Sequence, residues 1–408
     1  MMSKKSPQLR FEGFTDDWEE RKLGDVGNTF TGLTGKTKED FGHGSAKFVT
    51  YVNVFKNPIA TLDQLDAIEI DEKQNQVQKG DIFFTTSSET PEEVGMSSVW
   101  THDTENVYLN SFTFGYRPRV SFDLNYMASM LRSPSIRKKI TFLAQGISRY
   151  NISKTKMLEI EIPTPTLSEQ EKIGSFFKQL DNTIALHQRK LDLLKEQKKG
   201  YLQKMFPKNG AKVPELRFAG FADDWEERKL DELVEQIIRE VPKPNKPYYR
   251  MSVRSHAKGT FRQFVDNPDN VAMDKLFIVK KDDLVVNITF AWEHAIAVVK
   301  EENDGLLVSH RFPTYRADGK SDIKFLNYVV SKEDFRRKLE FISPGGAGRN
   351  RVLNKKDFLK LKIFVPKIEE QQKIGSFFKQ LDDTIALHQR KLDLLKEQKK
   401  GFLQKMFV

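Results

Sequence analysis

Apolar residues recur at alternating steps of four and three along the stretch Lys172–Phe206. The positions that follow this pattern are Ile173, Phe177, Leu180, Ile184, His187, Leu191, Leu194, Lys198, Tyr201 and Met205. A period of about 3.5 residues is typical of the seam of a coiled coil. As a helix, the stretch would be roughly 50 Å long at about 1.5 Å per residue. Because a single helix cannot bury its own seam, the pattern predicts a partner helix.

The same stretch returns as Lys373–Phe407, 201 positions later. The copies differ only where Asn182 aligns with Asp383 and where Tyr201 aligns with Phe402. Such similarity indicates an internal duplication, and the second copy is the obvious partner of the first. The apolar positions expected to form the coiled-coil seam are Ile173, Phe177, Leu180, Ile184, Leu191, Leu194, Ile374, Phe378, Leu381, Ile385, Leu392 and Leu395.

Two polar residues interrupt the seam of each copy. His187 and Lys198 stand at seam positions of the first copy, and His388 and Lys399 at those of the second. Polar seam residues can fix the register of a coiled coil at some cost in stability. The alternative is that these side chains reach solvent where the helices fray or splay apart, and the pattern leaves both interpretations open.

A shorter motif is repeated out of phase with the helices. Pro7–Leu23 returns as Pro214–Leu230, 207 positions later. The order is therefore motif, unlike segment and long helix, followed by the same three parts again. This cyclic order implies pseudo-two-fold symmetry, which predicts an antiparallel helix pair. A constant frame around two dissimilar segments indicates one scaffold that carries two recognition modules.

Each unlike segment has the pattern of a mixed α/β domain of roughly 150 residues. The first is expected to begin with loops over Gly24–Gly44, and Ser168 is the expected N-cap of the first long helix. In the first segment we expect strands at Phe48–Val54, Asp81–Thr85, Val107–Arg117 and Leu158–Ile162, and a helix at Leu124–Leu143. In the second we expect strands at Leu276–Val279, Leu284–Ile288, His310–Tyr315 and Leu361–Val365, and a helix at Phe325–Ile342. The expected fold class is thus α/β (mixed α+β), with two recognition domains separated by two long antiparallel coiled-coil helices.

Charge and composition favour an anionic partner. The formal net charge is +10, and the isoelectric point is near 9.3. This balance is compatible with nucleic acid, although basic helices often present only a solvated face. The absence of cysteine excludes disulfides and thiolate metal sites. Neither an apolar leader nor a membrane-length apolar run is present, so we expect a cytoplasmic protein with no membrane partner.

Two polar loops that follow the predicted helices are the candidate DNA-binding elements, and the polar cluster Thr85–Ser88 at the end of a predicted strand could add contacts in the first segment. Arg can read guanine edges and Asn can read adenine edges, while Ser and Thr mostly contact phosphate. The candidate residues are Thr85, Thr86, Ser87, Ser88, Gly146, Ser148, Arg149, Tyr150, Asn151, Gly348, Arg349, Asn350 and Arg351. The alternative for such loops is an ordinary turn at a helix end. Their recurrence at matching positions of both segments favours the functional interpretation.

Catalytic motifs find little support, so we expect no catalytic residues, no bound metal and no cofactor. The segment TGLTGKT resembles a phosphate-binding loop, but Phe30 stands where the first glycine is required. Neither the H-E-x-x-H zinc motif nor an Asn-Pro-Pro-aromatic methyltransferase motif is present; Asn267 precedes Pro268 and Asp269. Any methyl transfer or cleavage would come from partner subunits.

The layout resembles the specificity subunit of type I restriction-modification systems. The resemblance covers essentially the whole chain and rests on Trp18–Leu23, Gly146–Ser153 and Glu169–Ile173, together with their second copies. These copies are Trp225–Leu230, Gly348–Leu353 and Glu370–Ile374. In the second loop, Ala347, Arg351 and Leu353 stand where the first has different residues.

The resemblance implies a non-catalytic, sequence-specific DNA-binding subunit for host defence and DNA methylation. Each target-recognition domain would read one half of a bipartite site, and the helices would set the spacer. The implied partners are double-stranded DNA, two methyltransferase subunits and, through the complex, restriction subunits. The implied domains are residues 1–165 and 208–367 for recognition, and 166–207 and 368–408 for the coiled-coil helices. Two alternatives are a stand-alone DNA-binding regulator and a coiled-coil scaffold that binds only proteins.

Overall fold

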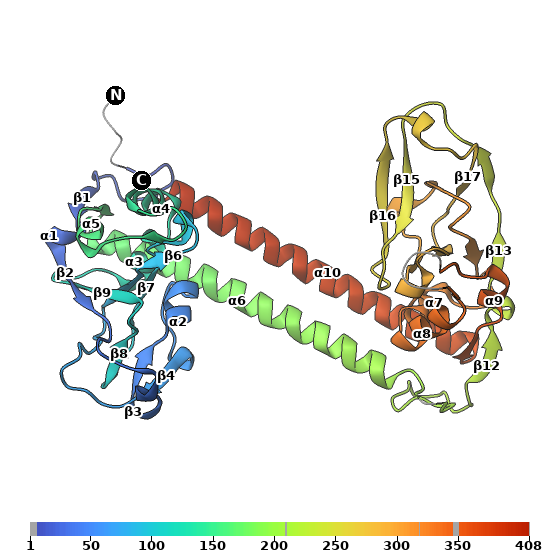
Figure 1. Ribbon diagram of the computed structural model, residues 1–408, viewed down its shortest axis with the longest axis horizontal. Helices are drawn as coiled ribbons and strands as arrows, with labels where there is room; N and C mark the ends of the chain where they lie inside the picture. The colour runs from blue at the N-terminus through green and yellow to red at the C-terminus, as the bar shows by residue number, and fades with distance from the viewer. Residues whose placement is uncertain (1–5, 209, 318, 346–350, 408) are drawn as a thin grey trace. The chain divides into compact units, whose positions relative to one another are not determined.

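The computed structural model describes residues 6–208, 210–317, 319–345 and 351–407 (Figure 1). The chain divides into two compact units, which are described separately below. The first unit comprises residues 1–189 and 389–408, and the second comprises residues 190–388. Both division points lie inside a long helix, so each unit contains one part of each long helix.

The long helices are α6 (Leu167–Lys204) and α10 (Ile368–Lys405), each of 38 residues. In the first unit, the rings of Phe176 and Phe402 lie 5.0 Å apart, and Asp181 forms an ion pair with Lys399 at 2.5 Å. Since rising numbers on α6 meet falling numbers on α10, the helices are antiparallel there, as the repeat order predicts.

The second unit has the equivalent pairing between the other halves of the helices. The rings of Tyr201 and Phe377 lie 5.2 Å apart, and Lys198 forms an ion pair with Asp382 at 2.5 Å. Lys198 and Lys399, two of the four polar seam residues, therefore both have a carboxylate partner on the opposite helix. All twelve apolar seam positions named above are buried or half-buried.

The prediction that Ser168 caps the first long helix is wrong. Helix α6 already begins at Leu167, and the Glu169 N–H donates to Oγ1 of Thr166 at 3.4 Å. The earlier start places Glu169 and Gln170 in the first turn, where both side chains are buried. Gln170 Nε2 donates to the carbonyl of Pro165 at 2.9 Å and fixes the chain that enters the helix.

The first unit is built on a four-stranded sheet of order β2-β9-β5-β7 and a three-stranded sheet of order β4-β3-β8. Its larger strands are β1 (Glu19–Lys22), β2 (Gly27–Thr31), β3 (Phe41–Val49), β4 (Leu65–Ile68), β5 (Ile82–Thr85), β7 (Ser97–Val99), β8 (Val107–Leu109), β9 (Thr113–Pro118) and β11 (Glu161–Thr164). Its short helices are α1 (Leu23–Val26), α2 (Tyr51–Lys56), α3 (Leu124–Met130), α4 (Pro134–Leu143) and α5 (Lys154–Leu158).

Several predicted elements of this unit are divided by local capping. The predicted strand Phe48–Val54 ends at Val49 because Thr50 caps α2. Val107–Arg117 forms two strands in different sheets, and the Asn110 side chain accepts the Phe112 N–H at the turn between them. Leu124–Leu143 forms two helices because Pro134 lacks an N–H and Ser133 caps α4.

The ends of the first segment also differ from expectation. Gly24–Gly44, predicted as loops, contains β2 and the start of β3. The predicted strand Leu158–Ile162 begins later, because Leu158 is the last residue of α5 and β11 runs over Glu161–Thr164. Both errors arise because short elements with few apolar residues depend on tertiary pairing rather than on local pattern.

The second unit repeats the four-stranded sheet in the order β13-β21-β18-β19. Its second sheet has five strands in the order β14-β17-β20-β15-β16. The strands are β12 (Glu226–Lys229), β13 (Glu235–Ile237), β14 (Glu240–Pro242), β15 (Tyr248–Val253), β16 (Thr260–Val265), β17 (Lys275–Ile278), β18 (Leu284–Val286), β19 (Ile296–Val298), β20 (Leu307–Val308), β21 (Thr314–Arg316) and β22 (Lys362–Val365). Its helices are α7 (Ile323–Val330), α8 (Glu333–Phe341) and α9 (Lys355–Leu359), so the predicted helix Phe325–Ile342 is again two helices.

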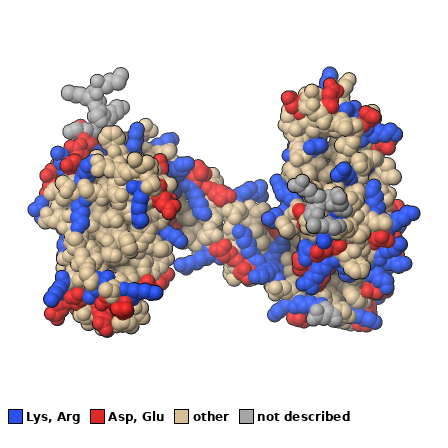
Figure 2. Space-filling model, in the orientation of Figure 1, with Lys and Arg blue, Asp and Glu red and all other residues tan. Residues whose placement is uncertain are grey.

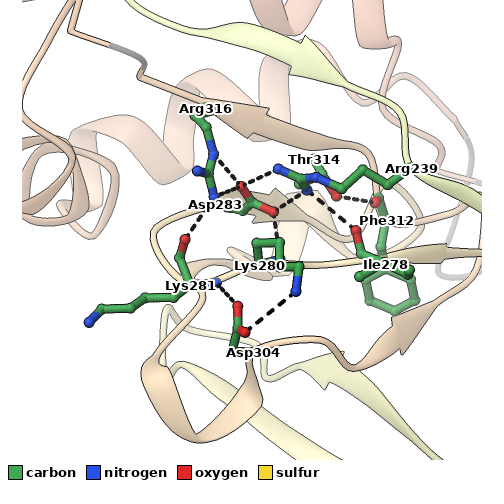
Figure 3. Close-up of polar contacts among 9 residues, drawn as sticks. All are labelled: Arg239, Ile278, Lys280, Lys281, Asp283, Asp304, Phe312, Thr314 and Arg316. Carbon is green, nitrogen blue, oxygen red and sulfur yellow. Dashed lines mark hydrogen bonds and ion pairs between the residues drawn. The ribbon is translucent and has the colours of Figure 1, made fainter.

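Each unit contains a buried aspartate at the turn into its central strand. In the second unit Asp283 is fully buried and accepts hydrogen bonds from Arg239 at 2.6 Å and from Arg316 at 2.9 Å (Figure 3). It also accepts the Lys280 N–H at 2.7 Å. In the first unit Asp81 accepts in the same way from Arg117 at 2.7 Å and from the Gln78 N–H at 2.7 Å. The two modules therefore share their internal frame as well as their flanking motifs.

The repeated short motif locks each unit to the start of a long helix. Arg10 donates to both carboxylate oxygens of Glu169 at 2.7 and 2.8 Å, and Glu169 is 1% exposed. This carboxylate raises the pKa of the Arg10 guanidinium above its usual value. Arg217 makes the same bidentate contact with Glu370, at 2.7 Å for both bonds. The motifs thus act as structural clamps.

The end of one long helix completes the core of each unit. Met406 and Phe407 are buried in the apolar core of the first unit, and the Leu9 N–H donates to the carbonyl of Lys405 at 2.9 Å. Met205 and Phe206 occupy the equivalent place in the second unit. Among the described residues, no helix combines the length and the apolar character that crossing a membrane requires.

Candidate nucleic-acid interface

In the first unit, the two predicted polar segments lie side by side. Strand β6 (Ser87–Ser88) pairs antiparallel with β10 (Tyr150–Asn151). Arg149 Nε donates to Oγ of Ser87 at 3.2 Å. Residues more than 60 positions apart in the sequence therefore form one polar surface.

Within this surface, several predicted residues are engaged inside the fold. Thr85 is fully buried, and its hydroxyl accepts the Met96 N–H at 2.9 Å. Thr86 donates to the carbonyl of Phe112 at 2.8 Å, and Ser88 donates to Glu93 at 3.2 Å. These hydroxyls hold the strand ends in place, whereas Ser148 and Arg149 are exposed.

The loop that presents Arg149 is closed at its base. The backbone groups of Gln145 and Asn151 exchange hydrogen bonds of 2.9 and 2.8 Å. Gly146 has φ +143°, and a Cβ there would lie 2.0 Å from the carbonyl oxygen of Arg149. Glycine is therefore required, and the loop tip presents Ile147, which is 96% exposed, together with Ser148 and Arg149.

Two arginines of the first unit are engaged inside the fold and unavailable to a ligand. Arg132 donates to the carbonyls of Val54 and Ser97, and Arg137 donates to that of Gly95. Burial lowers the pKa of each guanidinium to about 10, so both remain charged at neutral pH. These two cations hold loops together.

The predicted loop of the second unit is described only in part. Gly348, Arg349 and Asn350 lie outside the described residues. Arg351 lies 3.4 Å from Glu340, and its guanidinium is 5.5 Å from the centroid of the Trp292 ring. The loop returns to the fold at an equivalent point, because the Leu353 N–H donates to Ile288 O at 2.9 Å, as the Ile152 N–H donates to Thr86 O at 3.0 Å.

A polar concavity of about 240 Å³ beside that point was not predicted from the sequence. The side chains able to read base edges that line it are Arg250, Gln263, Asn287, Thr289 and Arg311. Arg250 and Gln263 are cross-strand neighbours in the hairpin β15–β16, and Arg250 Nε donates to the Gln263 Oε1 at 2.9 Å. The hydroxyl of Tyr248, which also lines the concavity, is buried and has no hydrogen-bond partner among the described residues.

The signal for this concavity was present but weak. Arg250 and Ser252 alternate with the buried Met251 and Val253, which is the pattern of a strand with one polar face. The sequence alone does not reveal that Gln263 lies opposite Arg250, because strand register depends on the turn between them. Among the residues that the structure describes, no group of three or more His, Asp or Glu is arranged to hold a metal ion.

Comparison with known proteins identifies the architecture. The family model for the type I restriction modification DNA specificity domain matches residues 15–196 and 222–397. A Methanocaldococcus jannaschii protein assigned as the specificity subunit of the type I restriction enzyme MjaX is 23% identical over 405 residues, covering 95% of this chain and 92% of the relative. The StySPI type I restriction enzyme specificity subunit of Salmonella potsdam is 21% identical, covering 90% of this chain and 82% of the relative.

A solved structure has the same fold. The crystal structure of the S subunit of a type I restriction-modification system from M. genitalium matches over 99% of both chains, with a TM-score of 0.59 and 15% sequence identity. The two matched segments of the family model coincide with the two copies of the motif–module–helix arrangement. The chain therefore belongs to the family of type I restriction-modification DNA specificity domains, of which it carries two copies.

Proposed function

We propose that this chain is the non-catalytic DNA-reading subunit of a type I restriction-modification complex, and that each recognition domain reads one half of a bipartite site. The observation that carries this proposal is that the two units share their internal contacts but differ in their exposed polar residues. The clamps at Glu169 and Glu370 and the turns at Asp81 and Asp283 are the same in both units. A single partner surface would give the modules no reason to differ, whereas two different DNA half-sites would.

The reading surfaces differ in the way that this function requires. The first unit presents an exposed loop tip that contains Ser148 and Arg149, and the second presents a concavity with Arg250, Gln263 and Asn287. Arg, Asn and Gln can each form bidentate contacts with base edges in the major groove. The recognition domains would span residues 1–165 and 208–367.

The long helices, residues 166–207 and 368–408, would set the spacer between the half-sites and bind two methyltransferase subunits. Their seam residues are turned inward, yet each helix also has two leucines, seven residues apart, that are more than half exposed. These are Leu186 and Leu193 on α6, and Leu387 and Leu394 on α10. Exposed apolar side chains that recur every two turns on one face of a helix are suited to protein contacts. Restriction subunits would join through the complex in the cytoplasm.

Mapping methylated positions in whole genomes tests the proposal. Cells with the complete system should show methylation at a two-part sequence, and deletion of this chain should abolish it. Exchange of residues 24–160 for the corresponding segment of another family member should change one half of the methylated sequence and leave the other half and the spacing unchanged. A change of both halves together, or methylation that persists without the chain, would contradict the proposal.

A further inference from the structure

The second unit contains a groove of about 850 Å³ between the C-terminal part of α6 and the recognition domain. Seven lysines line it: Lys195, Lys198, Lys199, Lys208, Lys258, Lys300 and Lys332. Lys and Arg side chains also gather on the part of this unit where α8 lies (Figure 2). Only three acidic residues, Glu333, Asp334 and Asp382, line the same groove.

Most of this positive charge is not neutralised within the chain. Three of the seven lysines have a carboxylate partner: Lys198 pairs with Asp382, Lys199 with Glu196 and Lys208 with Glu215. Of the acidic residues in the groove, Glu333 is itself paired with Arg336. Across the described part of the chain, Lys195, Lys258, Lys300 and Lys332 have no carboxylate within ion-pair distance. Burial lowers the pKa of Lys332, whereas Lys195, Lys258 and Lys300 are exposed. The groove therefore has a surplus of cations that an anionic ligand would neutralise.

One wall of the groove is held in a fixed conformation. Ala257, Lys258 and Gly259 belong to the turn that joins β15 to β16. His256 and Ala257 have φ +60° and +51°, values that side-chain-bearing residues rarely adopt. Their N–H groups donate to the carbonyls of Glu293 and His294, both at 2.8 Å. The backbone that carries Lys258 is thus fixed before any ligand binds.

The groove and the polar concavity are connected by this hairpin. Arg250 and Gln263 on its strands line the concavity, while its turn lines the groove. Gln263 is four residues from Gly259, a distance of about 13 Å at about 3.3 Å per residue. That length corresponds to roughly four base pairs at about 3.4 Å each. A duplex that is read at the concavity would have phosphates close enough to contact the groove.

The first unit lacks the corresponding charge on its recognition domain. Lys396 and Lys400 on α10 are the repeat copies of Lys195 and Lys199. On the recognition domain, however, the equivalent positions are not lysines. The Trp100 N–H donates to the carbonyl of Asp81 as the Val299 N–H donates to that of Asp283, so Thr101 corresponds to Lys300. Ser133 and Lys332 correspond because they are the N-caps of the equivalent helices α4 and α8. The lysine groove is therefore a property of the second unit and not of the shared frame.

We propose that this lysine groove binds the phosphate backbone of the DNA next to the half-site read by the second domain. The proposal rests on the function proposed above and names a contact that contributes affinity without reading sequence. Each neutralised phosphate releases counterions, so it should contribute about 0.9 to the slope of log affinity against log salt concentration. The groove would make DNA binding more salt-dependent through the second domain than through the first.

The test uses the full chain assembled with its methyltransferase subunits, and a duplex that carries the methylated sequence. Kd is measured between about 50 and 200 mM salt, the range in which phosphate contacts dominate. The variants are K195Q/K199Q/K258Q/K300Q and its helix-only form K195Q/K199Q, and the matched control is K396Q/K400Q. Because these lysines are exposed, folding should be preserved, which circular dichroism and Tm would verify.

We expect the four-residue variant to lower the salt slope by up to about four and to leave the methylated sequence unchanged. K195Q/K199Q should lower the slope by up to about two, and the matched control by less than about one. An unchanged slope in the four-residue variant would overturn the proposal, as would an equal effect of the control pair. Loss of complex assembly in the four-residue variant would also overturn the proposal and would assign the groove to an acidic protein partner. Failure of the unaltered complex to prefer its own sequence over random duplex would refute the proposed function itself.

Discussion

The two units have the same internal contacts but different polar surfaces. The ion pairs Arg10–Glu169 and Arg217–Glu370 are formed by the same residue types, and the corresponding N–O distances agree within 0.1 Å. The surfaces near the recognition loops, by contrast, are an exposed tip in one unit and a lined concavity in the other. Contacts that close each unit against a long helix tolerate little change, whereas exposed polar residues can diverge without cost to the fold.

The internal contacts of the two units differ at the tryptophan of the repeated motif. Trp18 Nε1 donates to Glu169 at 3.1 Å, so this carboxylate accepts from two side chains. Trp225 Nε1 is buried at the equivalent place and has no hydrogen-bond partner among the described residues. The same sequence motif therefore contributes one more hydrogen bond in the first unit than in the second.

The largest effect should follow from changing the length of the paired helices. Inserting two residues after Glu196 and two after Glu397 rotates the following seam by about 200° and separates Tyr201 from Phe377 and Phe176 from Phe402. We expect loss of methylation. Four-residue insertions rotate the seam by only about 40° and add about 6 Å, or roughly two base pairs of spacer. An active four-residue variant with an unchanged spacer in methylation mapping would show that the helices do not set it.

The clamps should contribute strongly to stability in both units. Glu169→Ala and Glu370→Ala each remove a fully buried carboxylate and leave a half-buried arginine without its partner, which costs up to about 3–5 kcal/mol. Denaturant unfolding would measure this cost, and the exposed Glu171→Ala on the same helix should change stability by less than about 0.5 kcal/mol. A cost below about 1 kcal/mol in one unit alone would show that the clamps are not equivalent.

The reading surfaces should affect specificity and leave stability unchanged. Arg149→Ala, Arg349→Ala and Arg250→Ala should each weaken binding to the cognate duplex by about 1–3 kcal/mol and relax one position of the site. The first variant should relax the half-site opposite to the one relaxed by the other two. Competition between cognate and singly altered duplexes measures this. Uniform weakening across all sequences would instead assign the residue to phosphate contact.

The smallest effect concerns the unequal tryptophans. Trp18→Phe and Trp225→Phe remove similar volume, but only the first also removes a hydrogen bond. We expect Trp18→Phe to destabilise the protein by about 1 kcal/mol more than Trp225→Phe. Equal free energies of unfolding would mean that the bond from Trp18 to Glu169 adds nothing beyond the contact with Arg10.

Sequence patterns predicted the parts of the fold that repeat over long distances. The heptad and the order of the motifs predicted the antiparallel helices, since an apolar period of about 3.5 residues sustained over 35 residues has few other solutions. Short elements were less predictable. The helix break at Ser133–Pro134 and the caps at Thr50 and Thr166 depend on single side chains, which apolar periodicity does not register.

The candidate interface was only partly predictable for a related reason. The first loop was predictable because Gly146, whose φ is positive, lies close in the sequence to the exposed polar residues Ser148 and Arg149. The second concavity joins Arg250 and Gln263 from two strands with Asn287 and Arg311 from two other segments. No local pattern identifies residues that meet only after the sheet has formed. Whether these residues bind DNA remains a prediction.

The burial of Met406 and Phe407 in the first unit has a consequence for the order of events during synthesis. Ribosomes add about 5–20 residues per second, and the N-terminal domain of a multidomain chain generally folds first. Here residues 190–388 contain the whole second unit, whereas the first unit needs residues made roughly 200 positions after its own recognition segment. At those rates the first recognition segment waits about 10–40 seconds for these residues, and the second unit is complete about 1–4 seconds before the first. The first module to emerge would be the last to mature, and during that interval its open core is a natural substrate for chaperones.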